Sequence, residues 1–239
     1  CFLSPLLFYP RALRESGAVW VRQQSFEGRG SIEQLLVVQG QGGVIYYLLT
    51  ANGGVYRALD TGDSWVPANG PAGRGGLPRG GWGEIQVRDI DVSPSDPLVL
   101  FAAVQRVQRG RPTLYWTTDG GDTWWARGEM RDRVIQALAV APANDQVVYA
   151  ATEGALFRSA DGGETWINVW GMSYTAIADR EKWSHIEARY YDRVEQGDLW
   201  LVIGDRVWRS MDGGETWQEV TDGSYRDVGA TGDWKVVEG

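Results

Sequence analysis

Cysteine and histidine are almost missing from this chain of 239 residues, which has one of each, Cys1 and His185. No intramolecular disulfide can form, and a zinc site of the usual cysteine and histidine ligands is excluded. The same shortage excludes haem attachment through a CxxCH motif and iron–sulfur clusters bound by cysteine. We therefore expect neither a metal site nor a cofactor.

Lysine is also scarce, because only Lys182 and Lys235 accompany 21 arginines. The 23 basic residues are outnumbered by 31 acidic ones, and the net charge is −8. This balance argues against nucleic-acid binding, which requires a basic surface. Arginine suits planar hydrogen bonding with a partner.

Hydrophobic runs that would span a bilayer are lacking too. Residues 1–10 are uncharged but too few, and glycines divide the uncharged residues 34–56 into two short strands. A cysteine at position 1 is the residue that carries the acyl chains of a mature lipoprotein. We therefore predict a lipid anchor at Cys1 in an N-terminal segment, residues 1–18. The alternative is that position 1 is only a boundary of the given chain and that the apolar run is the stub of a longer helix. The anchor would hold an exported protein on the outer face of the cytoplasmic membrane or at the cell surface.

The remaining residues, 19–239, are organised by a repeat with the consensus S/T-x-D-x-G-x-T-W. It occurs at residues 58–65, 117–124, 159–166 and 210–217, and the first copy departs from it at Ala58 and Ser64. The residues that define the four copies are Asp60, Gly62 and Trp65, then Asp119, Gly121 and Trp124, then Asp161, Gly163 and Trp166, and finally Asp212, Gly214 and Trp217.

Each copy follows three runs of strand-forming residues, so each unit is predicted to be strand, strand, strand, tight turn, strand. In the turn, glycine takes positive φ while the aspartate carboxylate accepts backbone N–H groups. The tryptophan then begins the next strand and is large enough to fill the space between neighbouring sheets. The four aspartates are therefore expected to stabilise the fold. A calcium loop is disfavoured because the alternating oxygen ligands and closing glutamate of an EF-hand are missing.

This repeat resembles the Asp-box, or BNR, repeat of β-propellers. Families that carry it include sialidases, xyloglucan-degrading glycoside hydrolases, sortilin-type receptors and photosystem II assembly factors. The resemblance implies an all-β propeller of four-stranded antiparallel blades, with the boxes at the periphery. Four blades are clear, and strands at 19–21 and 233–237 are predicted to close a fifth. The alternative is a fragment of a larger propeller.

The first strand of each blade is expected to line a central channel, where polar side chains either bind a ligand or simply face solvent. The candidates are Glu33, Gln34, Arg88, Asp89, Gln136, His185, Glu187 and Arg189. A second candidate surface is the glycine-rich insertion at residues 69–83. Arg74, Arg79 and Trp82 in this insertion are residue types that are common at the centre of interfaces. The alternative for the insertion is a solvated loop.

No complete catalytic set is apparent, since His185 is alone and the arginine triad of a sialidase is not recognisable. We therefore predict a protein that is not an enzyme. It would act as an accessory or assembly subunit that binds one or more protein partners in a membrane complex. The alternative is a propeller that binds or cleaves glycans.

Overall fold

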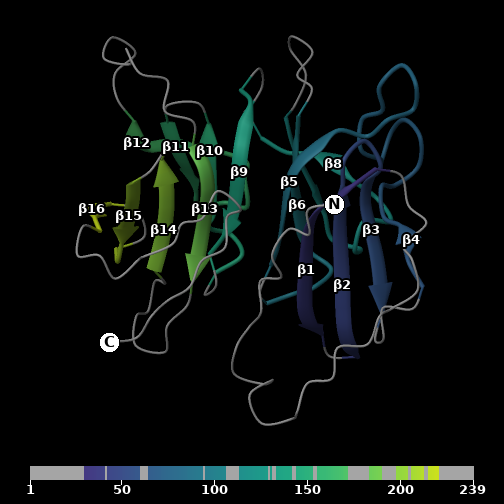
Figure 1. The fold of residues 1–239 in the computed structure, drawn as a ribbon, viewed down its shortest axis with the longest axis horizontal. Coiled ribbons are helices and arrows are strands. Elements are labelled where there is room, and N and C mark those ends of the chain that lie inside the picture. The colour runs from purple at the N-terminus through teal and green to yellow at the C-terminus, as the bar shows by residue number, and fades with distance from the viewer. Residues whose placement is uncertain are drawn as a thin grey trace.

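The computed structural model consists of four antiparallel sheets, each with four strands (Figure 1). It describes residues 30–40, 42–59, 64–93, 95–105, 113–128, 130, 133–141, 144–152, 155–171, 183–189, 198–203, 206–212 and 215–220. No side chain is described for residues 170–189 or 198–207. Among the described residues, none belongs to a helix long and apolar enough to cross a membrane.

Strands that are consecutive in the chain are neighbours in every sheet. The first sheet contains β1 (Ile32–Gly40), β2 (Gly43–Thr50), β3 (Gly54–Leu59) and β4 (Val66–Pro67). The second contains β5 (Val87–Val92), β6 (Leu100–Val104), β7 (Leu114–Thr117) and β8 (Trp125–Ala126). The third contains β9 (Ile135–Val140), β10 (Val148–Thr152), β11 (Ala155–Ser159) and β12 (Ile167–Gly171). The fourth contains β13 (Trp183–Arg189), β14 (Asp198–Ile203), β15 (Arg206–Ser210) and β16 (Gln218–Glu219).

The predicted order of three strands, turn and strand is confirmed in all four sheets. Each repeat lies between the third and fourth strand, and its tryptophan immediately precedes the fourth. Where side chains are described, the second strands β6 and β10 are wholly buried. The fourth strands are short, and β4, β8 and β16 are exposed at the outer edge. β6 and β10 therefore form the core of their sheets.

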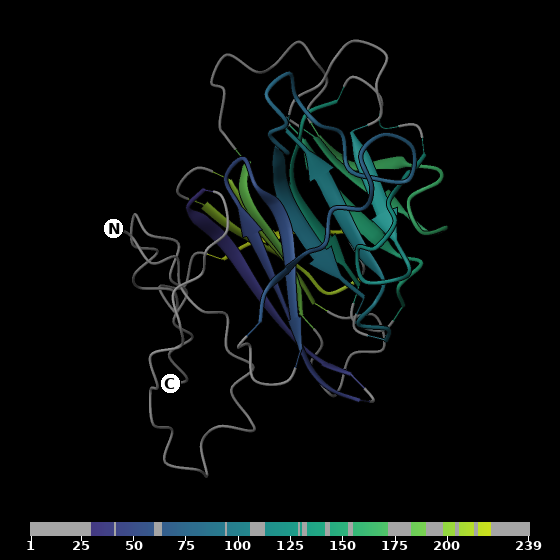
Figure 2. The ribbon, with the colours of Figure 1, turned by 90° about the vertical axis from the view of Figure 1, so that its right-hand side faces the viewer.

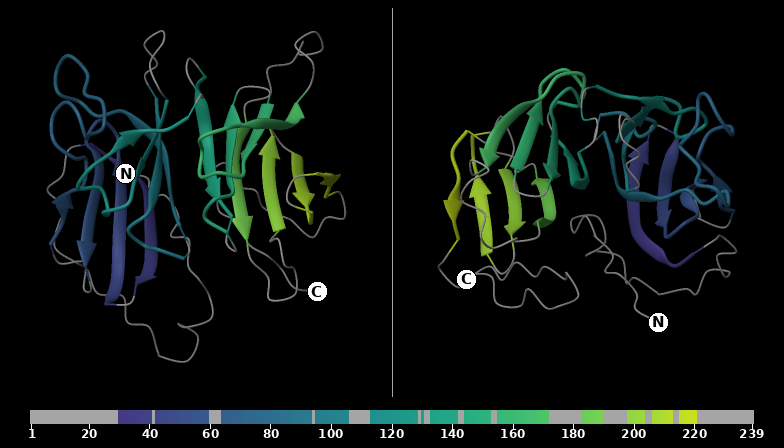
Figure 3. Two further views of the ribbon diagram at one scale, coloured as in Figure 1. Left: turned by 180° about the vertical axis from the view of Figure 1, so that it is seen from behind. Right: turned by 90° about the horizontal axis from the view of Figure 1, so that it is seen from above.

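The sheets follow one another in chain order around an arc (Figure 3, right). Contacts link the first strands in sequence, β1 with β5, β5 with β9, and β9 with β13. Figure 2 shows the sheet of β1–β4 beside that of β5–β8. These first strands are called the inner strands below. The strands predicted at 19–21 and 233–237 lie outside the described residues, so a fifth blade stays a prediction.

Three apolar clusters fill the spaces between successive sheets. The first joins sheets one and two and includes Tyr47, Leu49, Ile90 and Trp124. The second joins sheets two and three, and the third joins sheets three and four. Each space therefore receives residues from the sheets on both of its sides. Burial of this apolar surface holds the arc together.

Candidate functional site

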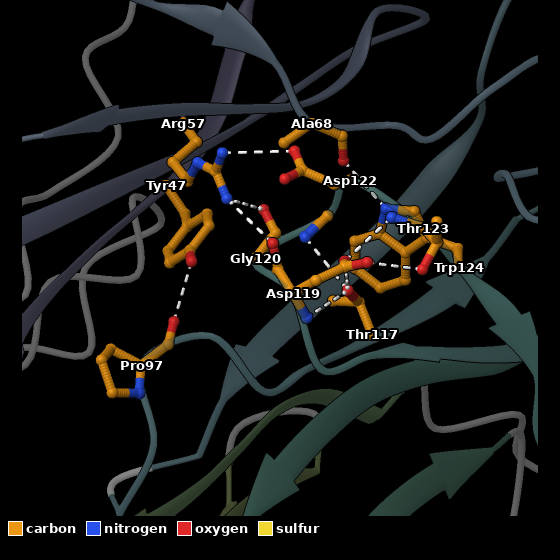
Figure 4. A network of polar contacts seen from close by, with 11 residues as sticks. Tyr47, Arg57, Ala68, Pro97, Thr117, Asp119, Gly120, Asp122, Thr123 and Trp124 are labelled. Carbon is orange, nitrogen blue, oxygen red and sulfur yellow. Dashed lines mark hydrogen bonds and ion pairs between the residues drawn. The ribbon is translucent and has the colours of Figure 1, made fainter.

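The second repeat shows what the aspartate of each box does (Figure 4). Asp119 Oδ1 accepts the Thr117 hydroxyl at 2.6 Å and the backbone N–H of Thr123 at 2.8 Å. Asp119 Oδ2 accepts the Thr123 hydroxyl at 2.5 Å. The Thr117 hydroxyl oxygen in turn accepts the N–H of Gly121 at 3.0 Å. The carboxylate therefore ties the two ends of a tight turn together.

The hydrogen bonds of the box favour an ionised carboxylate. Burial raises the pKa of Asp119, but the bonds from Thr117 and Thr123 outweigh it, so the pKa is lowered overall. In the third box, the hydroxyl and N–H of Thr165 and the hydroxyl of Ser159 lower the pKa of Asp161 to about 2. Asp119, Asp161 and Asp212 are thus held as anions by their own turns.

The box tryptophan joins its sheet to the preceding one. Trp124 is only 1% exposed, and its indole N–H donates to the carbonyl oxygen of Ala68 at 2.9 Å. Gly121 lies against the same residue with φ +95°, and a Cβ there would lie 2.5 Å from the Ala68 oxygen. Glycine is therefore required by both conformation and space.

An arginine of the preceding sheet binds the backbone and a side chain of this box. Arg57 on β3 donates to the carbonyl oxygens of Asp119 at 3.0 Å and Gly120 at 3.1 Å. It also forms an ion pair with Asp122 at 3.2 Å. The boxes are thus joints between sheets as well as turns within them.

The other boxes repeat the pattern as far as the structure describes them. Ser159, Asp161 and Thr165 form the same bonds in the third box, and Ser210, Asp212 and Thr216 in the fourth. Trp166 and Trp217 lie against the clusters between their own sheet and the preceding one. Asp60, Gly62 and Gly214 lie outside the described residues, whereas the ring of Trp65 packs edge-on against Tyr46.

Polar side chains of the inner strands hold the backbone of the next inner strand. Gln34 on β1 donates to the Ile90 carbonyl oxygen at 2.9 Å and accepts the Ile90 N–H at 3.2 Å. Asp89 and Asp91 on β5 accept the N–H groups of Leu138 and Val140 on β9, each at 2.6 Å. Gln34 and Asp89, both predicted channel residues, therefore cross-link successive sheets.

All four inner strands carry a β-bulge at the same place, near their first residue. The pairing with the second strand shifts between Ile32 and Gln34, between Val87 and Asp89, between residues 135 and 137, and between 183 and 185. The extra residue is therefore Glu33 in β1, Arg88 in β5, Gln136 in β9 and Ser184 in β13. We call these four positions the inner rim.

The bulges change which way the strands present their side chains. Val87 and Ile90, three residues apart, both join the cluster toward sheet one. Asp89, which lies between them in sequence, reaches sheet three. Strict alternation would not allow this, and the extra residue of the bulge does. Glu33 and Arg88 are exposed and Gln136 is half-buried.

Two of the predicted channel residues, His185 and Glu187, lie on β13 opposite Val202 and Trp200 of β14. Their side chains, like that of Arg189, are outside the described part of the structure. By register, His185 occupies the position that Gln34 and Asp89 occupy in their own sheets.

The insertion at 69–83 is anchored along its first half. Asn69, 5% exposed, accepts the N–H of Val55 at 2.8 Å and donates to the Gly53 carbonyl oxygen at 3.2 Å. Leu77 is buried, and the carbonyl oxygen of Gly75 accepts the backbone N–H of Trp124 at 2.8 Å. This half of the insertion packs on the second box, so the alternative of a fully solvated loop does not describe it.

The three residues predicted for partner binding lie on exposed parts of this insertion. Arg74 lies over the ring of Trp125, with 5.9 Å from its guanidinium carbon to the ring centroid. Arg79 donates to the Gly70 carbonyl oxygen at 3.4 Å. Trp82 is 94% exposed, at the tip of a turn in which Gly83 N–H donates to the Gly80 carbonyl oxygen. Partner binding here stays a prediction.

No group of three or more metal-ligating side chains is found among the residues that the structure describes. Asp119, Asp161 and Asp212 accept hydrogen bonds from donors of their own turns. The sequence predicts Glu33, Arg88 and Gln136 as channel-facing strand residues, whereas the strand pairing places each of them at a β-bulge. A bulge has no local signature here, since it is defined by pairing with another strand.

Comparison with known proteins places these features in context. No model of a known protein family matches the chain. A xyloglucanase from Paenibacillus sp is 26% identical over 164 residues, which make up 63% of this chain and 15% of that protein. A xyloglucanase from Hypocrea jecorina is 30% identical over 151 residues, 55% of this chain and 17% of that protein. The chain thus spans about one sixth of the length of these relatives.

Solved structures support the fold. The GH74 xyloglucanase from Xanthomonas campestris is similar with a TM-score of 0.58 and 19% identity, over 83% of this chain and 31% of that one. The fold is a β-propeller arrangement of four-stranded sheets. The resemblance inferred from the repeats is therefore confirmed for the fold.

The functional prediction needs correction. Similarity to two xyloglucanases contradicts the expectation of a non-catalytic accessory or assembly subunit and that of a protein without enzymatic activity. It favours the alternative of a glycan-directed propeller.

Proposed function

We propose that the chain is part of a glycoside hydrolase and that its propeller binds a β-linked glucan such as xyloglucan. The observation that carries this proposal is the sequence similarity to two xyloglucanases, each over more than half of the chain. The chain corresponds to about one sixth of the length of those proteins. We therefore propose that it contributes glucan binding to the hydrolase.

The surface of the insertion supports this proposal. Trp82 is exposed on a turn whose backbone is fixed, since its own N–H donates to Glu84 Oε2 at 2.9 Å and the Gly80 N–H donates to the Glu84 carbonyl oxygen at 2.8 Å. A large, flat and apolar ring held in this way offers a surface on which a sugar ring can stack. The insertion and the ends of the inner strands that carry the rim lie on the same side, because Ile85 N–H donates to the Asn52 carbonyl oxygen in the β2–β3 turn.

Hydrolysis of a glycosidic bond requires two carboxyl groups that flank the bond. Asp89 and Asp91 accept backbone N–H groups of β9, and Asp119 and Asp161 accept the donors of their turns. These four carboxylates maintain the fold, so we do not assign the reaction to them. A polysaccharide cannot cross a membrane unaided, and the proposal therefore includes export of the chain.

The test is to measure binding and hydrolysis of xyloglucan by the purified chain. Affinity gel electrophoresis with xyloglucan in the gel reports binding, and the release of reducing ends reports hydrolysis. We expect retardation in xyloglucan and none in a control gel containing β-mannan. Equal mobility in every gel together with no release of reducing ends would contradict the proposal.

A further inference from the structure

The inner rim is a site built from equivalent positions in successive sheets. In β5 and β9, one face of the inner strand is directed toward the preceding sheet and the other toward the following sheet. Val87 and Ile135 fill the clusters toward the preceding sheets, whereas Asp89 and Ala137 face the following ones. The bulge residue is an extra residue that interrupts this alternation. Its side chain is therefore not needed for packing against either neighbouring sheet.

The backbone beneath the rim is fixed by the bonds between inner strands. Gln34 follows Glu33 and holds Ile90, and Asp89 follows Arg88 and holds Leu138. The residue after each of these two bulges is therefore bonded to the next inner strand. Such bonds hold the bulge positions at constant separations, which reduces the entropy lost when a ligand binds.

The chemistry of the rim is mixed and nearly neutral. Partial burial raises the pKa of Glu33, and the positive charge of Arg88 lowers it by a smaller amount. A carboxylate accepts hydrogen bonds, a guanidinium donates them, and the amide of Gln136 does both. A ligand hydroxyl group also donates and accepts hydrogen bonds, so it suits all three side chains. An anionic ligand would be repelled by the carboxylate of Glu33.

We propose that Glu33, Arg88 and Gln136 form a binding site for the hydroxyl groups of a neutral oligosaccharide. This inference rests on the proposed function, because it names the residues through which the propeller contacts a glucan chain. Ser184 is at the fourth equivalent position and extends the same rim along the arc. The rim would thus contact successive sugar residues through successive sheets.

The test is isothermal titration of the full chain with a xyloglucan oligosaccharide and with cellohexaose. Glu33→Gln and Gln136→Ala are each expected to raise Kd about tenfold, because the first replaces a charged acceptor by a weaker neutral one and the second removes a hydrogen-bonding group. Glu215→Gln is the matched control, since Glu215 is exposed in the fourth box, and its Kd should equal that of the unaltered chain. Unchanged thermal unfolding of each variant would show that the bulge is intact.

The outcomes separate the two proposals. If the unaltered chain binds and the rim variants bind equally well, the rim assignment is overturned and the proposed function stands. If the unaltered chain binds neither oligosaccharide nor xyloglucan polymer, both fail. A loss in the rim variants that Glu215→Gln does not show supports the assignment. If the Glu33 variant binds an acidic oligosaccharide better than cellohexaose, the ligand class is wrong.

Discussion

The guanidinium of Arg127 lies over the ring of Trp116, with 4.1 Å between its carbon and the ring centroid. From there it donates to the carbonyl oxygen of Gly162 at 2.9 Å and pairs with Glu164 at 2.8 Å, both in the box of the next sheet. Arg57 makes the equivalent contacts from β3. Trp116 occupies the position in β7 that Arg57 occupies in β3. β7 therefore has no arginine at this position, and Arg127, which follows β8, supplies the guanidinium instead.

Removing this guanidinium should loosen the joint between the second and third sheets. Arg127→Ala is expected to lower the free energy of unfolding by about 1–2 kcal/mol, because a hydrogen bond to a charged donor and a cation–π contact are lost. Urea unfolding measures the change. If an arginine introduced by Trp116→Arg can replace the guanidinium of Arg127, then Arg127→Ala will lower the free energy of unfolding by less in the Trp116→Arg background than in the unaltered chain. Equal costs in the two backgrounds would show that the positions are not interchangeable.

The anchor of the insertion should depend on Asn69. Asn69→Ala leaves the buried N–H of Val55 without its acceptor, so we expect a loss of about 2–3 kcal/mol in the free energy of unfolding. The control is Asn144→Ala, which removes an exposed bond to the Gln146 N–H and should cost about 0.5 kcal/mol or less. Similar losses in both variants would contradict an anchoring role for Asn69.

The boxes predict sensitivity to acid. The folded pKa of Asp161, about 2, lies below its ordinary value of 3.8. A lowered pKa means that the ionised box stabilises the fold fully above about pH 4 and that this contribution is lost as the pH falls toward 2. We expect Asp161→Asn to be less stable than the unaltered chain at pH 7, with the difference shrinking in this range. A difference that is constant from pH 7 to pH 2 would contradict this account.

Trp82 should affect glucan binding without affecting folding. Trp82→Ala removes a side chain that is 94% exposed, so the unfolding midpoint should not change. Affinity for cellohexaose is expected to fall about tenfold as a stacking surface is lost, and Trp82→Phe should recover part of it. If Trp82→Ala binds as tightly as the unaltered chain, the insertion is not part of the glucan surface.

The hairpins could be predicted from the sequence because the residues that form each turn are neighbours in the chain. The eight residues of a box hold the carboxylate, both hydroxyl groups, the glycine and the tryptophan that form the turn, and no other segment is needed to close it. The three runs of strand-forming residues before each box then predict four strands per unit, and the resemblance of the boxes to Asp-box repeats implies the propeller.

The joints between sheets could not be predicted in the same way. Arg57 meets Asp119 and Asp122 across more than 60 residues, and Asp89 meets Leu138 across 49. Arg127 lies 35 residues before Gly162, and only the fold shows that its guanidinium reaches the third box. The functional prediction was wrong because it relied on the lack of a recognisable catalytic motif, and it is the similarity to two xyloglucanases that contradicts it.

The sequence by itself thus determined the turns, the strand order and the all-β class, because each depends on residues that are neighbours in the chain. The tertiary structure decided which polar side chains cross-link the sheets, which half of the insertion is anchored and where the inner rim lies. These features depend on strand pairing and on contacts between sheets. A residue such as Glu33 becomes a bulge position only when its strand pairs with the next.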